Sequence, residues 1–452
     1  MYMSRGSRTA ILAVCATVLL ATSACGDDQP EEATTQQVRL YGTDGNMLNS
    51  YPEELKDRAN LVDGMKGTTP LTPLPEDFKN RLRSVDSKLT DYLYAAEAYD
   101  AVVISALAAQ LAGSTDPADI AKQIVGVTND GTRCGTVNQC LRLAREGTDI
   151  EYRSVSITRA GFTDAGEPAT ASYATLHFDG QQLNDAKTEF VGAGDESTAS
   201  TKKPPAGKRQ TGNFPDPASG APLVLGGLLP RTGDLALAYP PIAAGAELAI
   251  KEINAAGGVL AEDVVWIDGD DGTNPAVAKA TVASHVAAGV HVIIGAGASG
   301  ISTAVLEDVV AAGLILFSPS NTAATLTEAN DDGLYFRTAP PDSLQGRALA
   351  DVILRDGPHK IAIVARKDSY GEGLQEAVRA ELERAGFGGD TVQLLGYAPG
   401  EDAEAAPIDF TDGAKQIKDF GADAVLIVGF GESAAVIRAL AEADVPLTAL
   451  GS

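Results

Sequence analysis

The sequence predicts an α/β protein of two Rossmann-like lobes, each with a mainly parallel sheet covered by helices, joined by a hinge. Short apolar strands alternate with helix-length segments from residue 222 onward, and this alternation restarts after Pro340-Pro341. The composition agrees, because a chain that is 44% hydrophobic and only 5% aromatic suits closely packed helices and strands. The 452 residues suffice for two lobes with hydrophobic cores.

The first lobe is expected over residues 222–340. Its predicted strands are 223–229, 264–267, 292–294 and 314–317, and its predicted helices are 242–255, 277–288 and 301–312. The helix 242–255 stops at Gly257-Gly258, a common helix-ending signal.

The hinge and second lobe are expected over residues 341–452. The predicted strands are 361–365, 392–395 and 424–428, the predicted helices are 373–385 and 434–443, and 446–450 resembles one more strand.

An earlier block, 38–191, contains a predicted strand at 38–41, a long helix at 89–112, and strands at 154–158 and 174–178. Alone it is a poor domain, because it has few strands to cover its helices. Residues 192–221 are rich in Gly, Ser, Thr, Lys and Pro and are expected to form a disordered linker.

The N-terminus has the order of a secretory signal: Arg5 and Arg8, an apolar run of 9–21, and then small residues before Cys25. It resembles a bacterial lipoprotein signal, with Thr22 where Leu is usual. The resemblance implies a signal peptide of 1–24, lipidation of Cys25, a flexible tether of 25–37, and anchoring to the outer face of the cell membrane. The alternative is an ordinary cleaved signal with an incidental Cys.

Charge and cysteine content exclude several classes of function. A formal net charge of −26 provides no basic surface for nucleic acid. Cys134 and Cys140 lie in one polar loop of an exported protein and are expected to form a disulfide; a metal pair lacks partners because the four His residues are scattered. Since no catalytic Cys–His, Ser–His–Asp or paired-carboxylate arrangement is visible, we expect no enzyme, no metal and no cofactor.

Longer motifs carry a family resemblance. The segments LVLGGLLPRTGDLALAYPPIAAGAELAIKEINAAGGV, GAGASGISTAVLEDVVAAGLILFSPSNTAATLT and IAIVARKDSYGEGLQEAVRAELERAG resemble type 1 periplasmic binding proteins of the Leu/Ile/Val class, over nearly all of 222–452. YGTDGN, LVDGMKGTTPLTP and YAAEAYDAVVISALAAQLAGSTDPADIAKQI in the first block resemble the C-terminal half of the same family.

The order of these segments indicates a circular permutation, with the family's C-terminal half first and 192–221 joining its usual end to its usual start. The alternative is two incomplete modules that complete each other between chains.

The resemblance assigns the ligand carboxylate to two loops that follow strands and precede helices. Ser299, Ser320 and Thr322 would hold it, with backbone help from Ala298 and Asn321. Helix capping by Ser and Thr is the alternative role.

The resemblance also implies the rest of the ligand site. Asp44 would pair with the ligand's ammonium, Tyr370 would close over the ligand, and Phe430 is a weaker candidate of the second lobe. Tyr239 is a further candidate for ligand binding, but it departs from the family pattern and leaves the shape of the side-chain pocket open. An Asp-Gly turn and a half-buried core Tyr are the alternative roles of Asp44 and Tyr370.

Together these features predict a monomeric solute-binding lipoprotein of an ABC importer. It would close its hinge on a small amino-acid-like ligand and then engage a membrane permease. A ligand sensor that feeds a signalling pathway is the alternative. An NAD enzyme is suggested only by Gly295–Gly300, GAGASG, which lacks an acidic ribose partner about 20 residues later. The sequence does not name the ligand.

Overall fold

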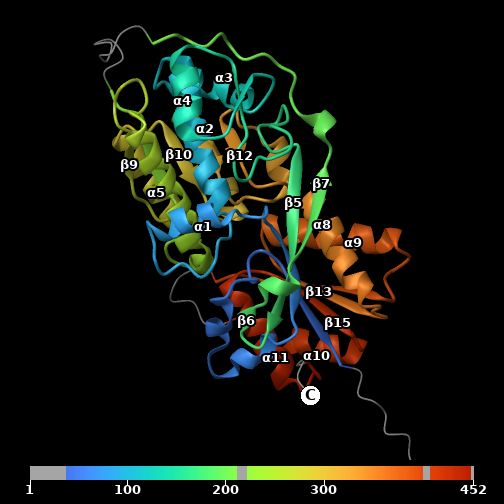
Figure 1. Cartoon of the computed structure of the whole chain (residues 1–452). Helices are drawn as coiled ribbons and strands as arrows, with labels where there is room; N and C mark the ends of the chain where they lie inside the picture. The colour runs from blue at the N-terminus through green and yellow to red at the C-terminus, as the bar shows by residue number, and fades with distance from the viewer. Residues whose placement is uncertain (1–36, 211–220, 401–407, 449–452) are drawn as a thin grey trace, which may run out of the picture. The chain divides into compact units, whose positions relative to one another are not determined.

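The computed structural model describes residues 37–210, 221–400 and 408–448. Within these ranges the chain forms two α/β lobes, each built on its own sheet (Figure 1). The predicted fold class of two lobes with mainly parallel sheets is therefore confirmed.

The first lobe contains a five-stranded, fully parallel sheet. Its strands in spatial order are β12 (Tyr335–Arg337), β11 (Ile315–Ser318), β10 (Val292–Gly295), β8 (Val224–Leu228) and β9 (Val265–Ile267). The helices of this segment are α5 (Tyr239–Ala255), α6 (Pro275–Ala287) and α7 (Ser299–Ala311), with short 3-10 turns η4 (Ala236–Ala238) and η5 (Ala324–Glu328).

The second lobe contains an eight-stranded sheet that draws on both ends of the chain. Its strands in spatial order are β14 (Val392–Tyr397), β13 (Ile361–Arg366), β15 (Ala424–Val428), β1 (Arg39–Gly42), β2 (Lys66–Pro70), β5 (Thr170–Asp179) and β6 (Gln182–Leu183), while β7 (Glu189–Gly194) pairs with β5. The four strands from β14 to β1 are joined by parallel pairings, as is β2, whereas β5, β6 and β7 pair antiparallel.

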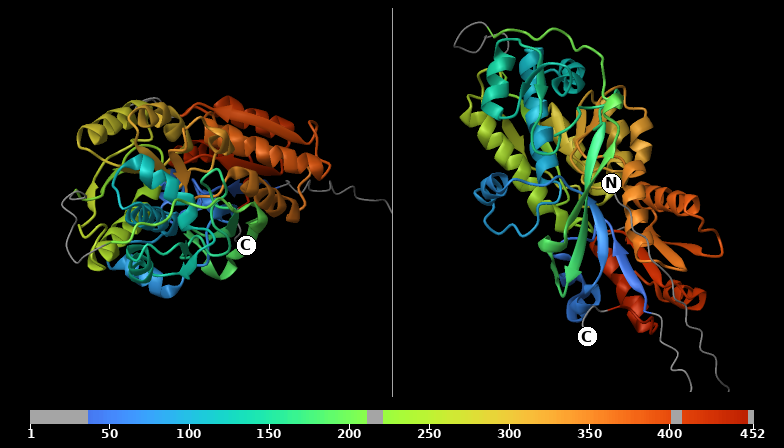
Figure 2. Two further views of the ribbon diagram at one scale, coloured as in Figure 1. Left: turned by 90° about the horizontal axis from the view of Figure 1, so that it is seen from above. Right: turned by 45° about the vertical axis from the view of Figure 1, so that its right-hand side comes forward.

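Helices from the late part of the chain belong to this second lobe. They are α8 (Asp342–Arg355), α9 (Ser369–Arg384), α10 (Thr411–Phe420) and α11 (Ala434–Glu442), with the 3-10 segment η6 (Gly431–Ser433). The early block adds the 3-10 segments η1 (Tyr51–Val62) and η2 (Asp185–Lys187) to this lobe. Figure 2 shows the early strands of this lobe, drawn in blue, beside its red C-terminal elements.

The early block also supplies the first lobe with helices. These are α1 (Glu76–Arg83), α2 (Ala95–Ala112), α3 (Pro117–Val127) and α4 (Val137–Arg145), with the small parallel pair β3 (Thr132–Cys134) and β4 (Ile150–Tyr152). α2 packs along α5, and its side chains share one core with Leu225, Ile294 and Phe317 of the five-stranded sheet. By length and composition α2 resembles a membrane span, but all of its residues are buried within the fold, so it is a core helix.

Within the described residues the chain passes between the two lobes four times. These passages are the segments from β2 to α2, from β4 to β5, from β7 to Lys208, and from β12 to α8. A buried ion pair joins two of them, because the Arg337 guanidinium donates from Nε (2.9 Å) and Nη2 (2.5 Å) to one carboxylate oxygen of Glu167. The region between the lobes is therefore fixed by specific polar contacts.

Three details differ from the sequence prediction. The long helix begins at Ala95 instead of Leu89, because Tyr94 adopts a left-handed conformation (φ 56°) that a helix cannot continue. The strand expected at 154–158 is absent, and β4 lies earlier, at Ile150–Tyr152. The expected strand 446–450 appears in its described part only as a bridge between Leu447 and Val38.

The expected linker 192–221 is also narrower than predicted. β7 extends through Gly194, and a 3-10 turn η3 (Glu196–Thr198) follows it. Backbone hydrogen bonds from Lys208 to Leu111 (2.8 Å) and from Gln210 to Arg145 (2.8 Å) then hold the segment on the first lobe. A composition rich in small and polar residues did not reveal that backbone pairing orders this stretch.

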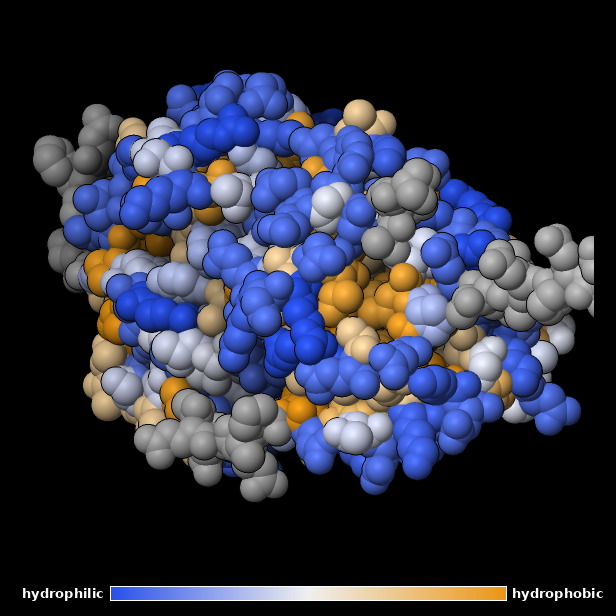
Figure 3. All heavy atoms as spheres, turned by 90° about the horizontal axis from the view of Figure 1, so that it is seen from below, coloured by the Kyte–Doolittle hydropathy of each residue, from blue (hydrophilic) through white to orange (hydrophobic). Residues whose placement is uncertain are grey.

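The surface keeps few large apolar side chains exposed among the described residues. Figure 3 shows one face on which hydrophilic side chains surround a patch of hydrophobic ones. The exposed large hydrophobic residues are Phe190, Val191, Val265, Val277, Val286 and Leu394. Most other large apolar side chains are buried in the hydrophobic cores of the two lobes.

Candidate functional site

A small pocket lies where the two sheets face each other, and we call it the interlobe pocket. The first lobe contributes Leu235, Ala238, Gly297, Ala298, Ser299 and Ser320, the second contributes Asp44, Gly45, Tyr370 and Phe430, and the passage into α2 contributes Leu93 and Tyr94. Several of these residues directly follow the carboxyl ends of parallel strands β10, β11, β1 and β15. Ligands of open α/β sheets bind at such strand ends.

Asp44 provides the charge of the second-lobe wall. Its carboxylate is 5% exposed and accepts hydrogen bonds from the Tyr94 hydroxyl (2.9 Å), the Tyr370 hydroxyl (2.9 Å) and Nε2 of Gln345 (3.2 Å). Burial raises the pKa of Asp44, while these hydrogen bonds oppose the shift. Since no Lys, Arg or His pairs with Asp44 in the ranges that the structure describes, its negative charge is balanced only by neutral donors.

The N-terminus of α7 forms the opposite wall. Ser299 is its first residue, and the Ser299 Oγ accepts hydrogen bonds from the backbone N–H groups of Thr322 and Ala323, both at 3.2 Å. The partial positive charge of a helix N-terminus favours an anion at this point. The pocket therefore has an end suited to an anion opposite the carboxylate of Asp44.

The two loops of this wall are cross-linked by side chains. The Ser320 Oγ donates to the Gly297 carbonyl (2.8 Å), and Nδ2 of Asn321 donates to the Ala296 (3.0 Å) and Gly297 (3.1 Å) carbonyls. Ser320 lines the pocket, whereas Asn321 lies behind it and shapes the loop. The side chain of Asn321 is thus occupied by structural hydrogen bonds.

Thr322 and Asp342 form a buried polar pair behind the pocket. Neither the Thr322 hydroxyl nor the Asp342 carboxylate has a hydrogen bond of ordinary geometry within the described residues. Burial and the charge of Asp44 raise the pKa of Asp342 well above its usual range. Buried polar atoms without hydrogen-bond partners are rare, so this pair is an unsatisfied polar region of the fold among the described residues.

Tyr370 and Phe430 form the aromatic part of the second-lobe wall. Their rings are stacked, with centroids 5.3 Å apart, and both side chains are almost fully buried. The Tyr370 hydroxyl also lies 2.8 Å from Oγ1 of Thr43. The stack fixes the direction of the Tyr370 hydroxyl toward Asp44.

The structure does not bring Tyr239 to this pocket. Its ring lies 5.2 Å from the Arg231 guanidinium, in a separate cavity of about 320 Å³ that also includes Trp266. Leu235 and Ala238 occupy the nearby positions of the interlobe pocket instead. The 3-10 turn η4 immediately before Tyr239 decides which residues face the pocket, and this turn was not evident from sequence.

Sequence reasoning missed part of the site. Leu93, Tyr94, Leu235, Ala238 and Gln345 were not assigned to it. The local sequence does not distinguish Tyr94 from a core aromatic residue of the predicted helix 89–112. The other residues are ordinary apolar or amide side chains that only the folded chain places near Asp44.

The interlobe pocket is nearly filled by its own side chains. Its cavity measures about 10 Å³, which is room for about one water molecule. An amino acid needs more space than this conformation offers.

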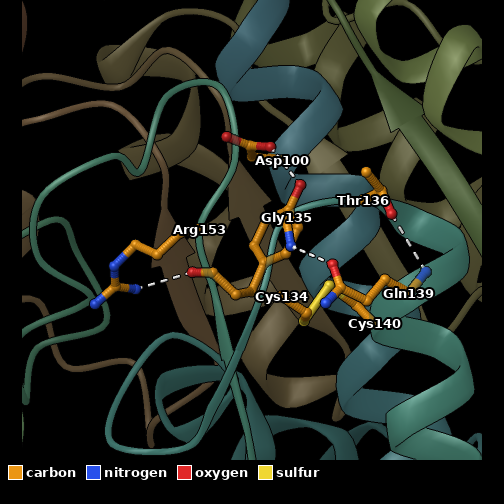
Figure 4. The surroundings of a disulfide bond; sticks show 8 residues. Asp100, Cys134, Gly135, Thr136, Gln139, Cys140 and Arg153 are labelled. Carbon is orange, nitrogen blue, oxygen red and sulfur yellow. Dashed lines mark hydrogen bonds between the residues drawn. A yellow bond between two sulfur atoms is a disulfide. The ribbon is translucent and has the colours of Figure 1, made fainter.

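Cys134 ends β3 and Cys140 lies in the first turn of α4 (Figure 4). Their sulfur atoms are bonded, and their Cα atoms are 5.4 Å apart. The enclosed loop is ordered by hydrogen bonds from the Gly135 N–H to the Gln139 side chain (3.3 Å) and from the Gln139 N–H to Oγ1 of Thr136 (3.3 Å). Cys25, the predicted lipidation site, lies outside the described residues.

Two α/β lobes with a pocket between their strand ends are the architecture of bilobal ligand-binding proteins. Residues 222–451 match the model of a family described as periplasmic binding protein. The chain belongs to this periplasmic binding protein family.

Curated relatives agree with this assignment. The chain is similar to Leu/Ile/Val-binding protein homolog 3 of Brucella melitensis (28% identity over 52% of this chain and 62% of the relative). It is also similar to the Leu/Ile/Val-binding protein of Citrobacter freundii (38% identity over 35% of this chain and 42% of the relative). The chain therefore spans about half the length of the curated relatives it matches.

Among solved structures, the chain is similar to the branched-chain amino acid transporter substrate-binding protein LivJ from Streptococcus pneumoniae in complex with isoleucine. The identity is 24%, the TM-score is 0.39, and the match covers 46% of this chain and 57% of that one.

Proposed function

We propose that this protein is an extracytoplasmic solute-binding protein of an ABC importer, which captures a small amino-acid-like ligand between its lobes. One observation carries the proposal: Asp44 faces the N-terminus of α7 across a single pocket. A free amino acid has an ammonium for the first group and a carboxylate for the second. The names of the curated relatives favour a branched-chain amino acid as the ligand.

Ligand capture in this proposal requires motion of the lobes. A cavity of about 10 Å³ admits no amino acid, so the ligand enters an open form and is enclosed when the lobes close. The Tyr94 and Tyr370 hydroxyls donate hydrogen bonds to Asp44, and the ligand's ammonium would take over part of this role. Closure would then present a surface to the permease.

We further propose that the chain order is a circular permutation within one polypeptide. Parallel pairing of β1 with β15, and of Val38 with Leu447, supports it, because strands from the two ends of the sequence complete one sheet. The family match beginning at residue 222 is a second support. A monomeric mass in light scattering is expected, whereas a stable dimer would favour exchange of halves between chains.

Lipid anchoring through Cys25 is part of the same proposal and rests on the sequence alone. Mass spectrometry of the membrane fraction should detect a diacylated N-terminal peptide that begins at Cys25. Replacement Cys25→Ala should release the protein from membranes. A wild-type protein that remains soluble after export would contradict the anchor.

Calorimetric titration with leucine, isoleucine and valine tests the ligand class directly. Asp44→Asn should weaken leucine binding by about 2 kcal/mol or more, because a buried ammonium loses its charged partner. Asp268→Asn, an exposed change in the first lobe, is the control and should leave the affinity unchanged. Absence of binding by all three amino acids would refute the branched-chain assignment, and equal affinities of wild type and Asp44→Asn would refute the role of Asp44.

A further inference from the structure

Arg366 is a buried cation beside the interlobe pocket, at the C-terminal end of β13. It is 3% exposed, and its guanidinium contacts three carboxylates. Nε donates to Asp368 (2.6 Å), Nη1 donates to Glu432 (2.6 Å), and Nη1 lies 3.6 Å from Asp234. One positive charge therefore serves three acidic groups.

Two of these carboxylates are local and fix the guanidinium within the second lobe. Asp368 also caps α9, because its other oxygen accepts the Gly371 N–H (2.9 Å). Glu432 also accepts the Tyr397 hydroxyl (2.8 Å) and the Phe430 N–H (3.1 Å). The orientation of Arg366 is thus set before the other lobe is involved.

The third carboxylate comes from the other lobe. Asp234 lies in the loop after β8, within the first lobe, and its side chain is 28% exposed. The Asp234 carbonyl also accepts a hydrogen bond from the Gly431 N–H (3.0 Å) in the second lobe. These contacts cross between the lobes, so they exist only while the lobes are closed.

Arg366 is also connected to the pocket wall through aromatic rings. Its guanidinium lies 4.0 Å from the centre of the Phe430 ring, and Phe430 stacks on Tyr370, whose hydroxyl bonds to Asp44. A planar guanidinium can stack on a ring and bond to carboxylates at its edge at the same time, which a lysine ammonium cannot do. One side chain thus contacts both the pocket wall and the opposite lobe.

We propose that Arg366 is a positioning residue that holds the Phe430–Tyr370 wall in place and latches the closed conformation through Asp234. Its action on ligand retention rests on the proposed function, whereas its action on closure does not. Asp234 engages the guanidinium on closing, and opening breaks that pair while Asp368 and Glu432 keep Arg366 in place.

The closure arm of the test needs no ligand. Spin labels at Glu307→Cys on α7 and Lys415→Cys on α10, both exposed positions in different lobes, report the distance between the lobes by electron double resonance. Ligand-free protein with Asp234 intact should populate a short distance, and Asp234→Asn should move much of the population to longer distances. Asp268→Asn, which removes an exposed ion pair with Arg231 inside the first lobe, should change nothing. Identical distributions for Asp234→Asn and its parent would overturn the latch.

The retention arm follows the release of tritiated leucine from unlabelled protein. Asp234→Asn should speed dissociation about tenfold with little change in association, since loss of a buried charge contact acts mainly on the dissociation rate. Arg366→Lys should also speed dissociation, because it keeps the charge but loses the stack on Phe430. An unchanged release rate in both variants would overturn the positioning role. If the wild type binds no leucine, the proposed ligand fails while the distance measurement still decides the latch.

Discussion

The two blocks of this chain, 38–210 and 222–448, differ in what each contributes to the lobes. The later block forms the whole sheet of the first lobe and three strands of the second. The earlier block adds the other five strands of the second sheet, but to the first lobe it gives mainly helices, including the fully buried α2. Each block thus leaves apolar surface that only the other covers, so the two halves form one cooperative unit.

Separating the blocks should have the largest effect. Residues 222–452 produced alone lose α2 from the core of the first lobe and leave an edge of β15 without β1. We expect an insoluble or molten product without near-ultraviolet circular dichroism, and recovery of that signal on co-expression with residues 38–210. A well-folded, soluble 222–452 fragment would show that the later block is an independent domain.

Packing between the blocks can be probed at single glycines. A Cβ at Gly245 on α5 would lie 2.1 Å from the Ala95 carbonyl oxygen of α2, whereas Gly373 on α9 has open space around it. Gly245→Ala should lower the free energy of unfolding by about 2 kcal/mol, and Gly373→Ala should raise it by up to about 1 kcal/mol. Denaturant unfolding measures the free energy of unfolding of both variants. The same change in both would mean that α2 and α5 can move apart to accommodate the added methyl group.

In the earlier block, the buried carboxyl group of Glu97 on α2 makes the stability of the fold depend on pH. Burial raises the pKa of Glu97 to about 8, and its Oε2 has no hydrogen-bond partner among the described residues. Because the folded pKa exceeds the unfolded value, the folded state holds this proton more tightly, and stability falls as pH rises from about 4.5 through 8.

Glu97→Gln removes this titration. It should increase the free energy of unfolding by about 2 kcal/mol at pH 8.5 relative to wild type, and the gain should shrink toward pH 5. Urea unfolding at the two pH values measures the difference. If Glu97→Gln raised the free energy of unfolding equally at both pH values, Glu97 would not be the group whose titration changes the stability.

The disulfide of the earlier block should have the smallest effect. Cys134 and Cys140 are six residues apart, so their bond closes a short loop, and the double replacement by Ser should cost about 2 kcal/mol or less. Thermal unfolding measures the loss, and a thiol assay of the unfolded wild type should find neither residue free. Two reactive thiols in exported protein would contradict the bond.

Sequence periodicity predicted the later block well for a physical reason. Buried parallel strands are short, apolar and bounded by turns, and residues 361–365 and 424–428 became β13 and β15 nearly as expected. The earlier block was predicted less well. Tyr94, in a left-handed conformation, delays the start of the long helix to Ala95, and β7 lies in a segment of small and polar residues that was predicted to be a linker.

Of the residues predicted for the ligand site, Asp44, Ala298, Ser299, Ser320, Tyr370 and Phe430 line the interlobe pocket. Asn321, Thr322 and Tyr239 do not line it, and Tyr239 faces a separate cavity. The distinction depends on side-chain direction at loop positions, which no periodic pattern encodes.

The sequence by itself determined the alternation of strands and helices, the polar residues at the strand ends and the acidic character of the chain, because these follow from local pattern and composition. Only the tertiary structure decided that β1 lies beside β15, that Tyr94 and Tyr370 both donate to Asp44, and that Asp234 reaches Arg366. These contacts join residues more than 45 positions apart, and pairing at such separations is set by how the lobes pack rather than by any local preference.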